Sequence, residues 1–188
     1  MHIILSPAFA VFALGLVCFA AFSWGVKGHF RRTGPVPAGT MLISLLTVGG
    51  FAWFALRLVF SAPGAAWPLA LLLFAAALAL FGWTIRATSQ TPPTLAFDTD
   101  KPSFLLRHGP YRYVRHPFYL SYLLFWTGTA VAASGLAPWL TPAVMLAVYR
   151  IAAGREEQKF AGSDFRMAYE AYQRHAGMFL PRVPVLVG

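Results

Sequence analysis

The sequence predicts an all-α fold, a polytopic membrane helix bundle that forms a single domain over residues 1–188. Three observations lead to this prediction: the chain is 58% hydrophobic, it is only 11% charged, and its mean hydropathy is +0.61. Soluble domains carry roughly 25% charged residues, so a water-soluble domain of this size is excluded. We expect about five transmembrane helices, the last two forming a helical hairpin, followed by a cytoplasmic amphipathic tail helix.

Three apolar runs near the N-terminus predict the first three helices. They cover about residues 5–26, 40–60 and 66–85, and each is close to the roughly 20 residues that cross a bilayer as a helix. No lysine or arginine precedes the first run, whereas basic residues follow it, which is the opposite of a signal peptide. We therefore expect the first run to be a retained helix.

Two shorter apolar runs predict the hairpin. Residues 118–134 and 137–151 are separated by the turn-forming stretch Ser134-Gly135-Leu136-Ala137-Pro138. Both runs are short, so each helix only just spans the bilayer. Small residues in the fourth helix, such as Gly128 and Ala132, are expected to allow close packing within the hairpin.

The two long polar segments have different patterns. Residues 86–104 show neither helical nor strand periodicity, which predicts a long irregular connection, and long loops in small proteins are often functional. The tail continues from Arg155 at helical spacing through Phe165, Tyr169 and Tyr172, which predicts an amphipathic helix lying against the membrane face.

The charge distribution predicts the orientation in the membrane. Lys and Arg total 15 against 6 Asp and Glu, but no basic run is interleaved with exposed aromatic residues, so no nucleic-acid partner is expected. Basic residues gather in the 27–39 loop, the 86–117 loop and the tail, which the positive-inside rule assigns to the cytoplasm. The N-terminus is then outside and the C-terminus cytoplasmic. Cys18 is the only cysteine, and no metal site is predicted.

The 107–119 segment holds three arginines and two histidines directly before an apolar run. Gly109-Pro110 marks a turn, and Pro117 suits the first position of the fourth helix, which places His116 near its N-cap. Unpaired N–H groups at such a helix start can bind a carboxylate or a phosphate. The alternative is that the arginines bind lipid phosphates and the tyrosines form an interfacial aromatic belt.

An acidic pair follows the fifth helix. Arg150 and Glu157 are seven residues apart, which places a cation and an anion on one helix face, two turns from each other. Both can point at one ligand. The alternative is a solvated helix face with local ion pairs.

Several short motifs together resemble one family. They are His-Gly-Pro-Tyr, Arg-His-Pro-Phe-Tyr-Leu, a later Glu-Glu, Tyr-x-x-Tyr and a closing Leu-Pro, spread over residues 101–182. This combination resembles the isoprenylcysteine carboxyl methyltransferase and phospholipid methyltransferase superfamily. The first three helices match only as hydrophobic spans.

The resemblance implies an integral membrane enzyme that binds S-adenosylmethionine in a cytoplasmic pocket, with residues 1–100 as scaffold helices and loop and residues 101–188 as the cofactor-binding and catalytic part. No Gly-x-Gly-x-x-Gly follows a strand-like run, which agrees with cofactor binding outside a Rossmann domain. By motif position, the cofactor-binding residues are Ser103, Phe104, Leu105, Leu106, Tyr111, His116, Pro117, Phe118, Tyr119 and Glu157.

The methyl acceptor is expected to be a lipid or a prenylated small molecule that enters from the bilayer. The leading prediction is carboxyl O-methylation of an isoprenylcysteine-like substrate, with Arg150, or in reserve Arg155, binding the carboxylate, and with Arg150 and Glu157 as catalytic residues. However, Ala153 occupies the position where carboxyl-methylating members carry an arginine. Either the helix register changes around Gly154 or the acceptor is not a prenylcysteine carboxylate.

Alternative functions stay open at this point. A phospholipid amine acceptor would give Glu156 or Glu157 the role of a base. An NADPH-dependent membrane sterol or enone reductase and a non-enzymatic membrane subunit are further alternatives. For the leading prediction, we expect His116→Ala and Glu157→Ala to weaken cofactor binding with little loss of fold.

Overall fold

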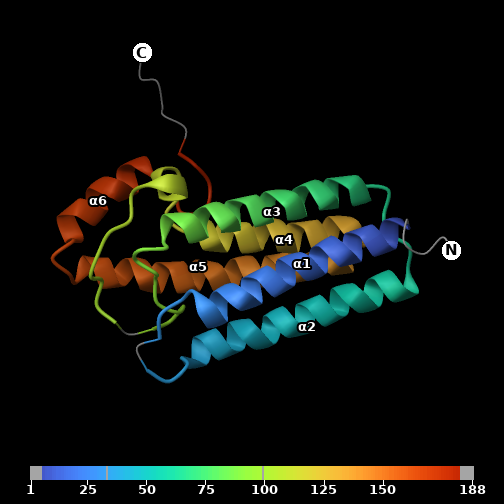
Figure 1. The fold of residues 1–188 in the computed structure, drawn as a ribbon, viewed down its shortest axis with the longest axis horizontal. Coiled ribbons are helices and arrows are strands. Elements are labelled where there is room, and N and C mark those ends of the chain that lie inside the picture. The colour runs from blue at the N-terminus through green and yellow to red at the C-terminus, as the bar shows by residue number, and fades with distance from the viewer. Residues whose placement is uncertain (1–5, 33, 99, 183–188) are drawn as a thin grey trace, which may run out of the picture.

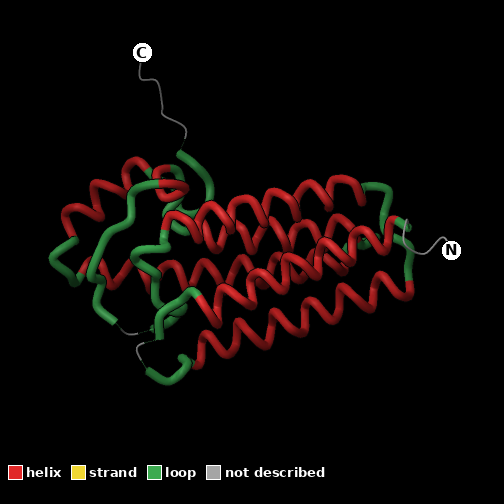
Figure 2. The backbone as a smooth tube through the Cα atoms, viewed as in Figure 1, coloured by secondary structure: helices red, strands yellow, loops and turns green. Residues whose placement is uncertain are grey.

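The computed structural model describes residues 6–32, 34–98 and 100–182. Over these residues it contains six α-helices, two short 3-10 turns and no β-strand, which confirms the all-helical prediction (Figures 1 and 2). The elements are α1 (Pro7–Gly28), α2 (Ala38–Phe60), α3 (Trp67–Ala87), η2 (Gly109–Arg112), α4 (Pro117–Ala132), η3 (Ala137–Trp139), α5 (Leu140–Ala161) and α6 (Arg166–His175).

Three helices in the described part of the chain, α1, α2 and α3, are long and apolar enough to cross a membrane. They coincide with the first three apolar runs. The helix α4 has 16 residues, or about 24 Å at 1.5 Å per residue, which is less than the roughly 30 Å of a bilayer core. The apolar part of α5 is followed by a charged stretch within the same helix. The count of five spans therefore stays a prediction.

Helix starts follow the local chemistry of the sequence. Ser6 caps α1, since its side chain accepts a hydrogen bond of 3.2 Å from the backbone N–H of Phe9. Pro117 begins α4, as predicted, because the first position of a helix needs no backbone N–H donor. The residue before it, His116, is the N-cap but does not cap with its side chain.

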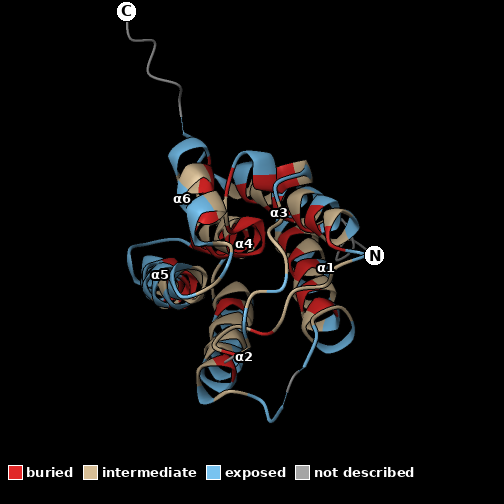
Figure 3. Cartoon of the chain, turned by 90° about the vertical axis from the view of Figure 1, so that its left-hand side faces the viewer, coloured by how far each residue is buried: buried red, intermediate tan, exposed pale blue. Residues whose placement is uncertain are grey.

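The helix α4 lies at the centre of the bundle, against α1, α3 and α5 (Figure 3). A Cβ on Gly128 would lie 2.6 Å from the ring of Phe74 on α3, so glycine at this position lets the aromatic ring approach the α4 backbone. Gly128 therefore serves the α3–α4 contact, and the prediction that it serves the hairpin was wrong. By contrast, α2 exposes large apolar side chains such as Leu45 and Val59, as expected of a helix that faces lipid.

The polar segments gather at one end of the bundle. Figure 1 shows α6 and the connection from α3 to α4 beside the end of α1 and the start of α4, whereas α1 begins at the opposite end. This places the irregular connection and the tail together. Which end faces the cytoplasm stays a prediction.

The tail differs from its prediction in two respects, its continuity and the surface on which it packs. The helix α5 ends at Ala161, Gly162 is its C-cap, and α6 begins only at Arg166. The apolar face of α6 packs on protein, because the ring of Tyr169 stacks on Phe160 with centroids 4.3 Å apart. This face was expected to lie against the membrane, but α5 and the connection before α4 already cover it.

Candidate functional site

Backbone hydrogen bonds join the 111–116 segment to the tail. The N–H of Arg115 donates to the carbonyl of Gly177 at 2.7 Å, and the N–H of His116 donates to the carbonyl of Met178 at 3.1 Å. These two parts of the chain are more than 60 residues apart. The structure thus brings together the two polar segments that the sequence singled out.

Two further features hold the tail in this position. The hydroxyl of Tyr172 on α6 donates to the carbonyl of Tyr111 at 2.6 Å. A Cβ on Gly177 would lie 1.7 Å from the carbonyl oxygen of Leu180, so the turn of the tail requires glycine there.

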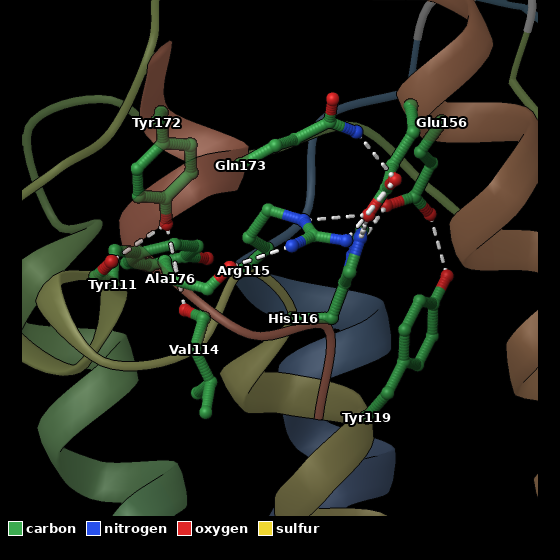
Figure 4. A network of polar contacts seen from close by, with 10 residues as sticks. Tyr111, Val114, Arg115, His116, Tyr119, Glu156, Tyr172, Gln173 and Ala176 are labelled. Carbon is green, nitrogen blue, oxygen red and sulfur yellow. Dashed lines mark hydrogen bonds and ion pairs between the residues drawn. The ribbon is translucent and has the colours of Figure 1, made fainter. Parts of the chain in front are cut away.

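The carboxylate of Glu157, near the end of α5, is the centre of a buried charge cluster. It accepts hydrogen bonds from Arg115 (Nε, 2.9 Å), from His116 (Nε2, 3.0 Å) and from Gln173 (Nε2, 2.9 Å). The side chains of Arg115 and Glu157 are only 8% and 12% exposed. Figure 4 shows His116 and Gln173 approaching the acidic end of α5 from different elements.

The neighbouring carboxylate, Glu156, has different partners. Its Oε1 accepts a hydrogen bond of 2.5 Å from the hydroxyl of Tyr119, and its Oε2 lies 3.5 Å from Nδ1 of His116 (Figure 4). Both ring nitrogens of His116 therefore face a carboxylate. Because a neutral imidazole has only one N–H, this arrangement favours the imidazolium form.

Opposing effects act on the pKa values in this cluster. Burial alone would lower the pKa of His116, but hydrogen bonds to Glu156 and Glu157 outweigh burial and raise it above its usual 6.5. Burial would raise the pKa of Glu157, but hydrogen bonds from His116 and Arg115 lower it from 4.5 to about 2.

These shifts predict how stability depends on pH. The raised pKa of His116 gives a contribution that is complete below pH 6.5 and is lost as pH rises through the folded-state pKa. The lowered pKa of Glu157 gives a contribution that is present above pH 4.5 and is lost as pH falls toward 2. We expect the thermal unfolding midpoint in detergent to be highest between pH 4.5 and 6.5. In His116→Gln the decline that begins just above pH 6.5 should disappear, and its persistence in that range would contradict this assignment.

A cavity of about 200 Å³ lies beside the charge cluster. Its wall combines the connection before α4, the start of α4, the inner face of α5 and the apolar face of α6. Most of the predicted cofactor-binding residues line it: Phe104, Leu105, Leu106, Tyr111, His116, Pro117, Phe118 and Tyr119.

Four predicted site residues do not line this cavity. Glu157 contacts the wall residues His116 and Arg115 but does not itself line the cavity. Ser103 is exposed. Arg150 is exposed on α5 and, within the described residues, its side chain makes no hydrogen bond or ion pair. Arg155 is also exposed, with its guanidinium carbon 5.1 Å from the centroid of the Phe97 ring.

The helix α5 runs without a break through Gly154. The register change that would have brought Arg150 toward the cavity is therefore not observed. Ala153, at the position of the expected arginine, is fully buried.

Several wall residues were missed by the sequence reasoning. Tyr122 and Tyr149 line the cavity, and the ring of Tyr149 stacks on Tyr119 with centroids 5.1 Å apart. One signal was present, because Tyr119 and Tyr122 are three residues apart and share a helix face. Another was that Tyr149 lies seven residues before Glu156, two turns along α5.

Comparison with known proteins places the chain in a family. A sequence model of the phospholipid methyltransferase family matches residues 66–167. The chain belongs to the phospholipid methyltransferase family. The matched range covers α3, α4, α5 and both carboxylates of the acidic pair. No curated protein and no solved structure matches the sequence.

The family assignment confirms the resemblance and extends its range toward the N-terminus. The short motifs indicated residues 101–182, whereas the family match begins at the start of α3 and ends within α6. The phospholipid methyltransferase family is a family of membrane methyltransferases, and the three apolar helices fit a membrane protein.

Proposed function

We propose that this protein transfers the methyl group of S-adenosylmethionine to a lipidic acceptor held in the membrane. The observation that carries the proposal is that the family match coincides with the cavity between the 111–116 segment, α4 and the end of α5. A water-soluble cofactor reaches this end of the bundle from the aqueous phase. A lipidic acceptor stays among the apolar helices.

The wall residues suit S-adenosylmethionine. The side chains of Phe104, Leu105 and Leu106 offer an apolar surface to adenine. The uncapped start of α4 offers backbone N–H groups to the carboxylate of the cofactor. When bound, the cofactor supplies an electrophilic methyl group on a sulfonium. The assignment of the cofactor ammonium to Glu157 stays a prediction, and in the folded chain this residue also positions Arg115 and His116.

The cavity favours an amine acceptor over a carboxylate. A carboxylate acceptor needs a free cation in the first cavity, beside the methyl donor, but Arg150 and Arg155 lie outside this cavity, and the guanidinium in the described part of its wall, Arg115, is paired with Glu157. An amine acceptor instead needs a group that takes its proton. Glu156 is in the wall and suits this role, so we propose phospholipid amine N-methylation, with isoprenylcysteine carboxyl methylation as the second candidate.

The predicted orientation fits this proposal. With five spans and the α6 end in the cytoplasm, the cavity faces the compartment that contains the cofactor. Positioning and exclusion of water are then the main contributions of the protein, because methyl transfer from a sulfonium needs little acid or base catalysis beyond deprotonation of the acceptor.

The proposal is tested with purified protein in vesicles and methyl-labelled S-adenosylmethionine. We expect the label to appear in phosphatidylethanolamine and not in a prenylcysteine peptide supplied in parallel. Transfer to the peptide alone would support the second candidate. Absence of transfer to either acceptor, with tighter binding of NADPH than of S-adenosylmethionine, would favour a reductase and overturn the proposal.

A further inference from the structure

A second cavity of about 310 Å³ lies deeper in the bundle, between α1, α2, α4 and α5. Its wall is largely aromatic and aliphatic, with residues such as Phe19, Phe125 and Trp126. It adjoins the first cavity, because the two share Val26, Ile43, Ser44, Tyr122 and Tyr149 in their walls.

The hydroxyl of Tyr122 is at this boundary and has no hydrogen-bond partner among the described residues, although the oxygen is buried. The neighbouring tyrosine hydroxyls are paired. Tyr149 accepts from the indole N–H of Trp126 at 3.3 Å, and Tyr119 donates to Glu156. Buried polar groups are nearly always hydrogen-bonded in folded proteins, so an unpaired hydroxyl on a residue that lines two cavities indicates a partner that comes from outside the chain.

We propose that the Tyr122 hydroxyl binds the reacting group of the methyl acceptor, and that the second cavity takes the apolar chain of the same molecule. This inference rests on the proposed function and adds the residue that aligns the acceptor. The second cavity lies between apolar helices, whereas the charge cluster and the start of α4 border the first. Tyr122 is therefore placed where an acceptor nitrogen would meet the methyl donor.

A cation at the second cavity agrees with a phospholipid acceptor. Lys27, in the last turn of α1, contributes to the wall of this cavity. Its ammonium suits the phosphate that lies next to the amine in phosphatidylethanolamine. The phosphate and amine of one headgroup would then contact Lys27 and Tyr122.

A hydroxyl can align an amine without changing its charge. The neutral amine donates one N–H to the oxygen of Tyr122, which directs the nitrogen lone pair toward the first cavity. Before this step the ammonium form of the acceptor gives one proton to Glu156. The new N–C bond then forms from that lone pair, the S–C bond breaks with its electron pair left on sulfur, and the product leaves as a methylammonium ion. Alignment of this kind acts on the acceptor and leaves cofactor binding unchanged.

The test compares Tyr122→Phe with Tyr149→Phe, since both tyrosines line both cavities and, among the residues that the structure describes, only the Tyr149 hydroxyl is paired. Tyr122→Phe removes a hydroxyl that no described residue uses, so we expect an unchanged or raised unfolding midpoint and unchanged affinity for S-adenosylmethionine. We expect kcat/KM for phosphatidylethanolamine to fall at least about 10-fold. Tyr149→Phe should lower the unfolding midpoint, because the Trp126 indole loses its acceptor.

Two results would overturn the inference: a Tyr122→Phe variant with wild-type kcat/KM, or one that loses cofactor affinity instead. Equilibrium binding of a short-chain phosphatidylethanolamine to the detergent-solubilised protein separates this inference from the proposed function. If the wild type transfers no methyl group but Tyr122→Phe still weakens lipid binding several-fold, the proposed function fails and the assignment of Tyr122 holds. If the wild type transfers no methyl group and Tyr122→Phe binds the lipid as tightly as the wild type, both the proposed function and the assignment of Tyr122 fail.

Discussion

Glu157→Ala is expected to lower the free energy of unfolding by about 3–5 kcal/mol, the usual cost of removing one partner of a buried ion pair. The guanidinium of Arg115 would stay buried without its carboxylate, and His116 and Gln173 would each lose an acceptor. A denaturant titration in detergent micelles measures the change. The sequence had suggested little loss of fold for this variant, but the burial of the pair changes that expectation.

The matched control is Glu170→Ala. Glu170 accepts a hydrogen bond from Arg166 on α6, but their side chains are 45% and 64% exposed. Exposed ion pairs contribute only about 0–1 kcal/mol, because solvent screens both charges. Equal losses of stability in the two variants would contradict the central position assigned to Glu157.

Glu156→Gln is expected to lower kcat for an amine acceptor by about 10²–10⁴, the usual contribution of a positioned general base. The amide oxygen of glutamine can still accept the hydrogen bond from Tyr119, and His116 loses its contact with Glu156 but keeps Glu157, so the variant should still fold and bind the cofactor. Initial rates at saturating cofactor, measured against phosphatidylethanolamine concentration, provide the comparison. The deficit should shrink as pH rises, because more of the amine is then already neutral.

The outcome of Glu156→Gln also separates the two acceptor classes. A carboxylate acceptor is already ionised at neutral pH and needs no base, so wild-type turnover by this variant would favour isoprenylcysteine carboxyl methylation. Glu170→Gln serves as the control for a change of charge on the same end of the protein, and we expect it to leave turnover unchanged.

The elements that could be predicted are those with a local cause. The length of an apolar run sets the length of a spanning helix, so α1, α2 and α3 appear close to their predicted ranges. Pro117 restricts its own backbone and lacks an N–H, so the start of α4 was predictable to the residue. The motif residues at the start of α4 could likewise be assigned to one cavity wall.

The residue roles that were mispredicted are those that depend on which helices are neighbours. Arg150 and Glu157 lie on the same face of α5, two turns apart. The side chain of Glu157 is covered by α6 and the 111–116 segment, whereas Arg150 is exposed. Gly128 was assigned to the wrong partner helix for the same reason. Helical periodicity reports which face a residue occupies and carries no information on what covers that face.

The sequence by itself determined that this chain is a helical membrane protein of a methyltransferase family, because composition, apolar run lengths and short motifs are properties of local stretches. Only the tertiary structure decided which groups share the cavities. The pairing of Arg115 with Glu157, and the Tyr122 hydroxyl that no described residue contacts by a hydrogen bond, arise where segments distant in sequence pack together. Burial and hydrogen-bond satisfaction are properties of that packing, and no single segment contains them.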